Sequence, residues 1–141
     1  MSSRHDRLTF FIDRDLGRTF FEVLGGDARF ESKRHDDLFP QNTSDPDWIV
    51  PVTDWGWIGV THDKAISRDH YPDILRAGAR ILVVVGKIEG AADNFRDTFP
   101  KIARFIELNR APFVARVYRP NEREARRLRP KGSIKLWEPG R

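Results

Sequence analysis

The sequence contains no cysteine, which excludes disulfides, thiolate zinc sites, iron–sulfur clusters and cysteine nucleophiles. No apolar run approaches the ~20 residues that a membrane-spanning helix requires, and the longest, Ile81–Val85, has the length of a strand. The first six residues are polar and lack the apolar segment of a secretory signal. The glycine-rich patterns of P-loop, dinucleotide-binding and serine-hydrolase sites are also absent. We therefore expect a cytoplasmic protein that makes no contact with membranes.

The length and the hydrophobic content of the chain suit one packed domain. The chain has 141 residues, of which 39% are hydrophobic, and this is enough for a single core. Short apolar segments alternate with amphipathic ones. We expect strands at 8–12, 57–61, 79–85 and 112–118, a short one at 29–34, and helices at 16–24, 71–77 and 91–109. This alternation predicts an α/β fold around a mostly parallel sheet flanked by helices.

The segment between the early and middle strands is polar. Residues 35–44 contain Pro40 and Asn42 and are expected to form a surface loop. Asp45 followed by Pro46 is typical of a helix start, with Asp45 as the N-cap. Because Pro51 follows soon after, we expect this helix to be short or kinked.

Aspartates follow two of the expected apolar strands. Asp13 ends the first strand, and His62 and Asp63 end the strand at 57–61. Ligands of open α/β sheets bind beyond the carboxyl ends of the strands, so neighbouring strands would bring these two side chains together. Asp45, or Asp47 beside it, would supply a third carboxylate. Such a cluster requires a cation, and oxygen ligands favour Mg²⁺ or Mn²⁺.

Each of these aspartates also has a structural explanation. Asp13 and Asp15 could cap the following helix, Asp45 could cap its own, and Asp63 could close a turn. Trp48, Trp55 and Trp57 fall within ten residues, where they could stack on bases or pack in the core.

Three segments together resemble the PIN-like domain family, and most closely the toxins of VapC type found in toxin–antitoxin modules. The segments are Phe11–Gly17, Asp45–Ile49 and Gly56–Lys64, and the resemblance extends from about Leu8 to about Pro120. It implies a PIN-like nuclease domain over residues 1–120, followed by a basic extension over residues 121–141. The activity implied is that of a metal-dependent endoribonuclease using Mg²⁺ or Mn²⁺, with RNA as substrate and an antitoxin as partner.

The resemblance also assigns residues. Asp13 matches the first acidic ligand, Asp45 the second with Asp47 as a fallback, and Asp63 the third, so these are the expected catalytic and metal-binding residues. Many PIN nucleases carry glutamate in the second position. For a fourth acidic ligand, the only candidates are Asp69 and Asp73.

Two other functions fit parts of the pattern. The Asp13–Gly17 segment also resembles the start of haloacid-dehalogenase-type phosphatases, in which the first aspartate is the nucleophile, but Gly17 occupies the usual Thr or Val position. A non-catalytic module that binds RNA or a protein partner is the other alternative.

Charge is unevenly distributed. Residues 1–70 have nine Lys or Arg against thirteen Asp or Glu, whereas residues 71–141 have sixteen against eight. The extension is strongly basic and could follow an RNA backbone. Its candidate nucleic-acid-binding residues are Arg123, Arg126, Arg127, Arg129, Lys131 and Lys135. The same segment could instead dock onto the antitoxin or onto a second copy of the chain in a homodimer.

Overall fold

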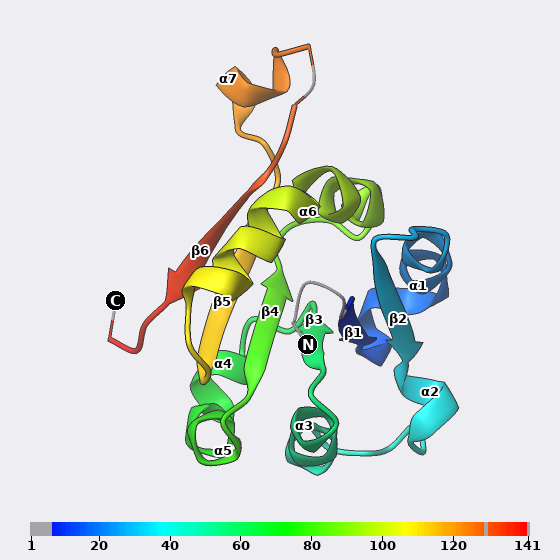
Figure 1. Cartoon of the computed structure of the whole chain (residues 1–141), viewed down its shortest axis with the longest axis vertical. Coiled ribbons are helices and arrows are strands. Elements are labelled where there is room, and N and C mark those ends of the chain that lie inside the picture. The colour runs from blue at the N-terminus through cyan, green and yellow to red at the C-terminus, as the bar shows by residue number, and fades with distance from the viewer. Residues whose placement is uncertain (1–6, 129, 141) are drawn as a thin grey trace.

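A computed structural model describes residues 7–128 and 130–140. Within these residues six strands form one sheet (Figure 1). The strands are β1 (Leu8–Ile12), β2 (Phe30–Arg34), β3 (Ile58–Thr61), β4 (Arg80–Val84), β5 (Phe113–Tyr118) and β6 (Ser133–Trp137). Their order is β2-β1-β3-β4-β5-β6; all neighbours are parallel except β5 and β6, which are antiparallel. The predicted α/β class with a mostly parallel sheet is confirmed.

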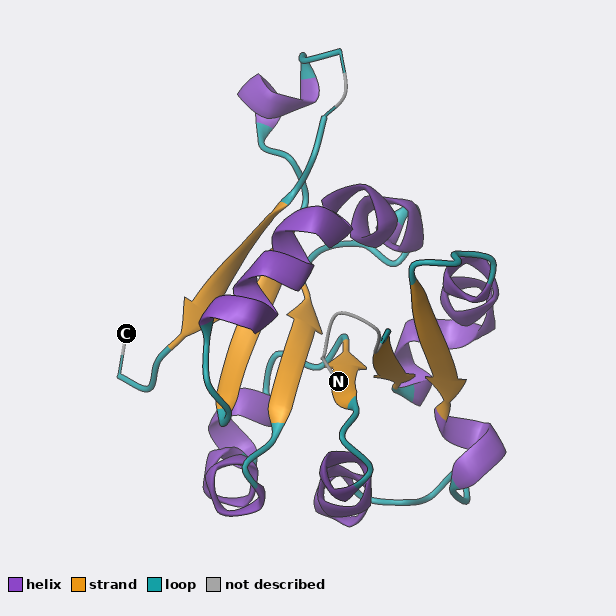
Figure 2. Ribbon diagram, in the orientation of Figure 1, coloured by secondary structure: helices purple, strands orange, loops and turns teal. Residues whose placement is uncertain are grey.

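Helices cover both faces of the sheet (Figure 2). They are α1 (Gly17–Gly25), α2 (His35–Leu38), α3 (Asp45–Asp54), α4 (Ile66–Asp69), α5 (Tyr71–Ala77), α6 (Ala91–Leu108) and α7 (Glu122–Ala125), with a 3-10 turn, η2 (Arg14–Leu16), before α1. One buried cluster joins α1 and α6 to one face, and a second joins α3, α4 and α5 to the other. Among the described residues, no helix is both long and apolar enough to cross a membrane.

The chain order reverses between β1 and β3. From β1 the chain goes to β2 on one side, and it then returns to place β3 on the other side of β1. In open α/β sheets this is the point where a crevice forms beyond the carboxyl ends of the strands. Asp13 and Asp63 follow these two strands, so the topology brings together the two aspartates that the sequence analysis singled out.

The polar segment before α3 differs from the prediction of a continuous loop. Residues His35–Leu38 form helix α2, and His35 is buried beside the rings of Phe11 and Phe39, each at 5.8 Å between centroids. A buried histidine inside a polar sequence leaves no apolar periodicity that would reveal the helix. Helix α4 was also missed, because its four residues are too few to show a helical periodicity.

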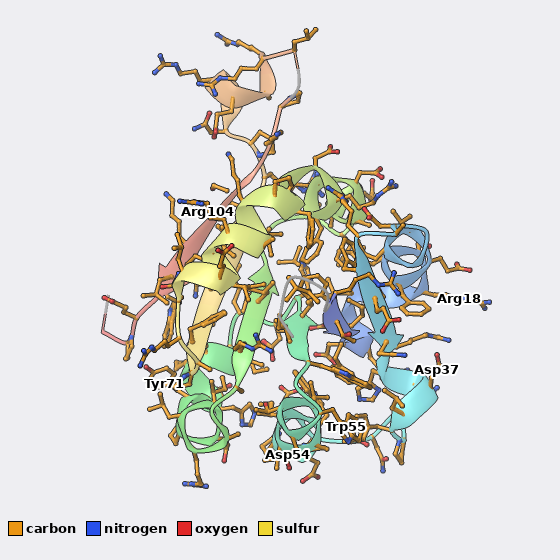
Figure 3. All side chains as sticks on the ribbon, viewed as in Figure 1. Arg18, Asp37, Asp54, Trp55, Tyr71 and Arg104 are labelled. Carbon is orange, nitrogen blue, oxygen red and sulfur yellow. The ribbon has the colours of Figure 1, made fainter. Side chains whose placement is uncertain are left out.

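Helix α3 also differs in its details. Ser44, and not Asp45, is the N-cap, and the Asp45 carboxylate accepts a hydrogen bond from the Trp48 indole (Nε1 to Oδ1, 3.0 Å). The helix continues through Pro51 to Asp54, although Pro51 lacks the N–H that would bond one turn earlier. Trp48 is fully buried in the core, whereas Trp55 remains about half exposed near α2 (Figure 3).

Trp48 fits against the sheet because residue 59 is a glycine. A Cβ on Gly59 would lie 2.8 Å from Trp48 Cζ3 and 2.9 Å from Ile81 Cδ1. We expect Gly59→Ala to lower the free energy of unfolding by about 1–3 kcal/mol, the usual cost of overpacking a core. Urea denaturation measures this directly. Gly25→Ala is the matched control, since a Cβ there meets nothing within 4 Å; an equal loss in both variants would contradict the packing explanation.

Candidate active site

Asp13 lies at the carboxyl end of β1 and is only 9% exposed. Its backbone N–H donates to the carbonyl of Val60, which continues the pairing of β1 with β3 by one residue. The carboxylate accepts hydrogen bonds from the backbone N–H of Arg14 (2.8 Å) and from the Thr61 hydroxyl (2.8 Å). The Arg14 contact is the helix-capping role considered from the sequence, and the Thr61 contact aims the other oxygen toward β3.

Asp15 reaches the same place from the η2 turn. Its carboxylate lies 3.1 Å from Thr61 Oγ1 and accepts a hydrogen bond from the backbone N–H of His62 (3.1 Å). Thr61 is fully buried at the end of β3 and also accepts from the N–H of Asp63 (3.1 Å). Because a hydroxyl carries a single proton, Thr61 donates to only one of the two carboxylates at a time. The facing oxygen of the other carboxylate then has no proton from Thr61, and a proton or a cation could satisfy it.

The pKa values of Asp13 and Asp15 are both raised, as expected for carboxylates without a nearby cation. The pKa of Asp13 is raised from 3.8 to about 7, first by burial, then by the negative charge of Asp15, with Asp45 adding to the effect. Hydrogen bonds from Thr61 and from the N–H of Arg14 oppose the rise. The pKa of Asp15 is also raised, chiefly by desolvation, with a contribution from Asp63. Perturbed carboxylates gathered in one pocket are typical of a functional site.

Asp45 and Asp63 complete the acidic group. Asp45 begins α3, with one oxygen bound to Trp48 and the other 3.8 Å from His70 Nε2. Asp63 accepts a hydrogen bond from the backbone N–H of Ala65 (2.9 Å), which is the turn-closing role considered from the sequence. Both aspartates therefore have structural partners and also line the pocket that Asp13 lines.

Two adjoining pockets surround Asp13. The acidic pocket is lined by Asp13, Arg14, Asp15, His35, Gln41, Thr43, Asp45 and Asp63. Its neighbour shares Asp13, Arg14 and His35 and adds Arg18, Arg34 and Asp36, among others. The three arginines of the second pocket are partly balanced by Asp36, which pairs with Arg14 at 2.9 Å and Arg34 at 3.8 Å. A phosphodiester fits this arrangement, because its negative charge can be bound by the arginines and also by a cation held in the carboxylate pocket.

The structure places the predicted site residues as follows. Asp13, Asp45 and Asp63 line one pocket, as expected from the strand ends and the helix start. Asp47 is exposed on the first turn of α3 and does not line that pocket. Neither candidate for a fourth acidic ligand lines that pocket: Asp69 pairs with Arg68 at 3.2 Å, and Asp73 pairs with Arg76 and with His70, which also lies near Asp45.

Asp15 and Thr61 are the residues that the sequence analysis missed. Asp15 was considered only as a cap or as part of a phosphatase-like motif, yet it shares Thr61 with Asp13. The signal was present in the sequence: two aspartates separated by one residue directly after an apolar strand, and a threonine at the end of the neighbouring one. The turn that directs Asp15 inward is a 3-10 turn, which periodicity does not reveal.

The donor set fits a hard divalent cation. In residues 7–128 and 130–140, no three His, Asp or Glu side chains are arranged so that they could hold a metal ion. Mg²⁺, however, usually keeps several waters and is bound by one or two carboxylates together with substrate phosphates. Asp13 and Asp15 supply two carboxylates that converge on one hydroxyl, with two more negative charges on the same pocket wall. The residues present therefore match this mode of binding.

The candidate RNA-binding residues of the tail lie apart from this pocket. Arg123 is in α7, Arg126 and Arg127 follow it, and Lys131 precedes β6; all four are exposed. Arg129 lies outside the described residues. In Figure 1, α7 stands beyond the far end of β5, away from the body of the sheet. Farther along the chain, β6 forms an edge strand of the sheet and pairs with β5.

Comparison with known proteins defines the class. The family described as "PIN like domain" matches residues 8–86, which contain β1 to β4 and all four aspartates of the acidic pocket. The chain therefore belongs to the PIN-like domain family, whose members are generally nucleases. No curated protein and no solved structure matches it.

Proposed function

We propose that this protein is a metal-dependent endoribonuclease whose acidic pocket holds Mg²⁺ or Mn²⁺. Its catalytic and metal-binding residues would be Asp13, Asp45 and Asp63, joined by Asp15. The observation that carries the proposal is the pair Asp13 and Asp15 on the single hydroxyl of Thr61, with the pKa of Asp13 raised to about 7. A buried cluster of carboxylates without a compensating cation is unfavourable, and a divalent cation relieves it.

When bound, the cation would polarise the scissile phosphate and activate a water for attack at phosphorus. The chain itself supplies the positioning. Thr61 lies between Asp13 and Asp15 and donates to either carboxylate, and the N–H groups of Arg14 and His62 hold their outer oxygens. Arg14, Arg18 and Arg34 in the adjoining pocket can bind the phosphates on either side of the reacting one. Arginine suits this task because its planar guanidinium bonds two phosphate oxygens at once.

Cleavage of a labelled single-stranded RNA tests the proposal. Purified protein should cut the RNA with Mg²⁺ or Mn²⁺ and lose this activity in EDTA, and excess metal should restore it. A small phosphate ester such as p-nitrophenyl phosphate serves as the control for the phosphatase alternative and should remain intact. Hydrolysis of the ester without RNA cleavage would overturn the nuclease proposal. RNA binding without cleavage under any metal would favour a non-catalytic module.

We further propose that the protein is the toxin of a toxin–antitoxin module, for which the likeness of residues 11–17, 45–49 and 56–64 to VapC-type toxins is the support. An antitoxin would inhibit the enzyme by placing an arginine or lysine among the carboxylates of the acidic pocket, where its charge replaces that of the metal.

Expression in a bacterial host provides the test of the toxin role. The wild type expressed alone should slow growth, and Asp13→Asn at the same protein level should relieve the effect, because the substitution removes one charge from the pocket while keeping its shape. Equal growth with both proteins, at levels matched by immunoblot, would argue against a toxin.

A further inference from the structure

The side of the β5–β6 pair that faces away from α6 carries cations and aromatic rings. On the α6 side, Ala115 and Val117 belong to the core cluster and Ile134 packs against it. Side chains alternate along a strand, so the other side carries the register pairs Val114 with Trp137, Arg116 with Lys135 and Tyr118 with Ser133. Figure 2 shows α6 crossing the near face of this pair of strands. We call Arg116, Tyr118, Lys135 and Trp137 the basic sheet face.

Arg116 joins two pockets on this face. One is lined by Arg116, Tyr118, Lys135, Leu136, Trp137 and Glu138. The other is lined by Lys64, Ala65, Ser67, Arg68, Arg116, Trp137 and Gly140. Four cations therefore line the two pockets, against Glu138 as the one carboxylate in either lining. Arg68 pairs with Asp69 at 3.2 Å and remains largely exposed.

Arg116 also has an unsatisfied donor. Among the described residues, its Nε is buried and has no hydrogen-bond partner. A buried donor without an acceptor costs free energy, so an anionic ligand whose oxygen reaches this atom would gain both a charge-assisted bond and relief of that cost. Phosphate oxygens have this chemistry.

The rings on the same face suit stacked bases. Tyr118 and Trp137 are partly exposed, and Lys135 Nζ lies 5.7 Å from the centre of the Tyr118 ring. Tyr71 supports Trp137 by an edge-to-face contact at 5.3 Å. Sheet faces that combine cations with exposed aromatic rings bind single strands through phosphate contacts and base stacking.

Consecutive residues line the acidic pocket and a pocket of the basic sheet face. Asp63 lines the acidic pocket, and the next residue, Lys64, lines one of the two pockets at Arg116. The hydrogen bond from the N–H of Ala65 to Asp63 fixes the turn between them. A strand lying on the basic sheet face would thus lead past Lys64 toward the carboxylates.

From these contacts we infer that the basic sheet face binds the single-stranded RNA substrate, with Arg116 holding a phosphate and Tyr118 and Trp137 stacking on bases. This inference rests on the proposed function for the identity of the nucleic acid. It assigns the substrate contacts to β5, β6 and the start of α4 rather than to Arg123 in α7 and Arg126 and Arg127 after it, which line neither pocket. Strands β5 and β6 also lie outside residues 8–86, so the family match does not include them.

Fluorescence anisotropy of a labelled single-stranded RNA 12-mer, in EDTA to prevent cleavage, tests the inference on the full chain. Arg116→Ala should weaken binding by about tenfold, and it should lower the log–log salt slope by ~0.7, the value for one phosphate contact on a single strand. Lys135→Ala changes an exposed side chain that does not support the fold, and it should weaken binding by about threefold. Arg104→Ala is the matched control, because Arg104 is exposed on α6 and faces solvent (Figure 3).

Wild-type affinity and salt slope in both Arg116→Ala and Lys135→Ala would overturn the inference. The inference would also be overturned if these variants bind RNA normally but differ from the wild type in molecular mass by light scattering. That result would assign the face to contact with a second copy of the chain. RNA binding that depends on Arg116, in a protein that cuts no RNA with Mn²⁺, would refute the proposed catalysis and leave the inference standing. If the protein cuts RNA but neither substitution changes RNA binding, the proposed catalysis stands and the inference about the basic sheet face is refuted.

Discussion

Asp13→Asn should reduce RNA cleavage by about 10²–10³-fold, the loss typical when one preorganised electrostatic group is removed from an active site. The substitution preserves the shape of the side chain and removes one negative charge from beside Asp15. Thr61 can still donate to the remaining carbonyl oxygen, so the fold around β1 and β3 should be intact. The rate of cleavage of labelled RNA at saturating Mn²⁺ measures the effect.

Asp54→Asn is the matched control for that experiment. Asp54 is exposed at the end of α3 opposite to Asp45, far along the helix from the acidic pocket (Figure 3). The same chemical change there should leave the cleavage rate within about twofold, since surface substitutions away from special features rarely matter. A large loss in both variants would point to a general charge effect, and no loss in Asp13→Asn would remove Asp13 from the catalytic group.

The second large effect concerns stability without metal. Because the folded-state pKa of Asp13 is raised from 3.8 to about 7, the folded protein holds a proton that the unfolded chain releases. The stability that this proton contributes is therefore fully present below about pH 4 and is lost as the pH rises through 7. One pKa unit corresponds to about 1.4 kcal/mol. After allowing for imperfect hydrogen bonds to the amide, we expect Asp13→Asn to stabilise the metal-free protein by about 1–3 kcal/mol at pH 8.

Urea denaturation of both proteins in EDTA, at pH 4 and pH 8, measures this difference. The gain in Asp13→Asn should appear at pH 8 and vanish at pH 4. Comparing the two proteins cancels the opposite contribution of Asp27, whose pKa is lowered by its hydrogen bonds to Arg29. A substitution that destabilises equally at both pH values would mean that Asp13 is a structural cap and that its burial costs nothing.

These two effects together separate a functional carboxylate from a structural one. A capping aspartate stabilises the fold, and its removal lowers stability. A carboxylate buried among like charges destabilises the metal-free fold, and its presence is then accounted for by a role in binding a ligand. Asp13 makes the capping contact to Arg14 and also has the raised pKa, so only the measured sign of the stability change shows which role dominates.

Much of the fold and part of the site could be predicted from the sequence. The strands at β1, β3 and β4 are apolar runs bounded by polar residues, and they place Asp13 and Asp63 at strand ends whatever the details of packing. The neighbour relation of β1 and β3 follows from the order of chain crossovers, which is a property of the whole sheet. The sequence pattern allowed β1 and β3 to be neighbours, but it did not predict that they are.

The features that sequence analysis missed depend on tertiary contacts. Asp15 enters the site through a single 3-10 turn, and α2 is a four-residue polar helix in which only the histidine is buried. The basic sheet face arises only when β6 pairs with β5, which sets Lys135 opposite Arg116 across the strands. Residues nineteen positions apart carry no local signal that they will share a surface.

The central claim is that the acidic pocket binds a divalent cation through Asp13. A crystal of the wild-type protein soaked in Mn²⁺ and measured at a wavelength where manganese scatters anomalously tests it most directly. We expect an anomalous peak about 2.2 Å from a carboxylate oxygen of Asp13, with Asp15, Asp45 or Asp63 within reach as a second ligand or through bound water. Manganese bound only elsewhere on the protein, with Asp13 still held by Thr61 and Arg14 alone, would contradict the claim.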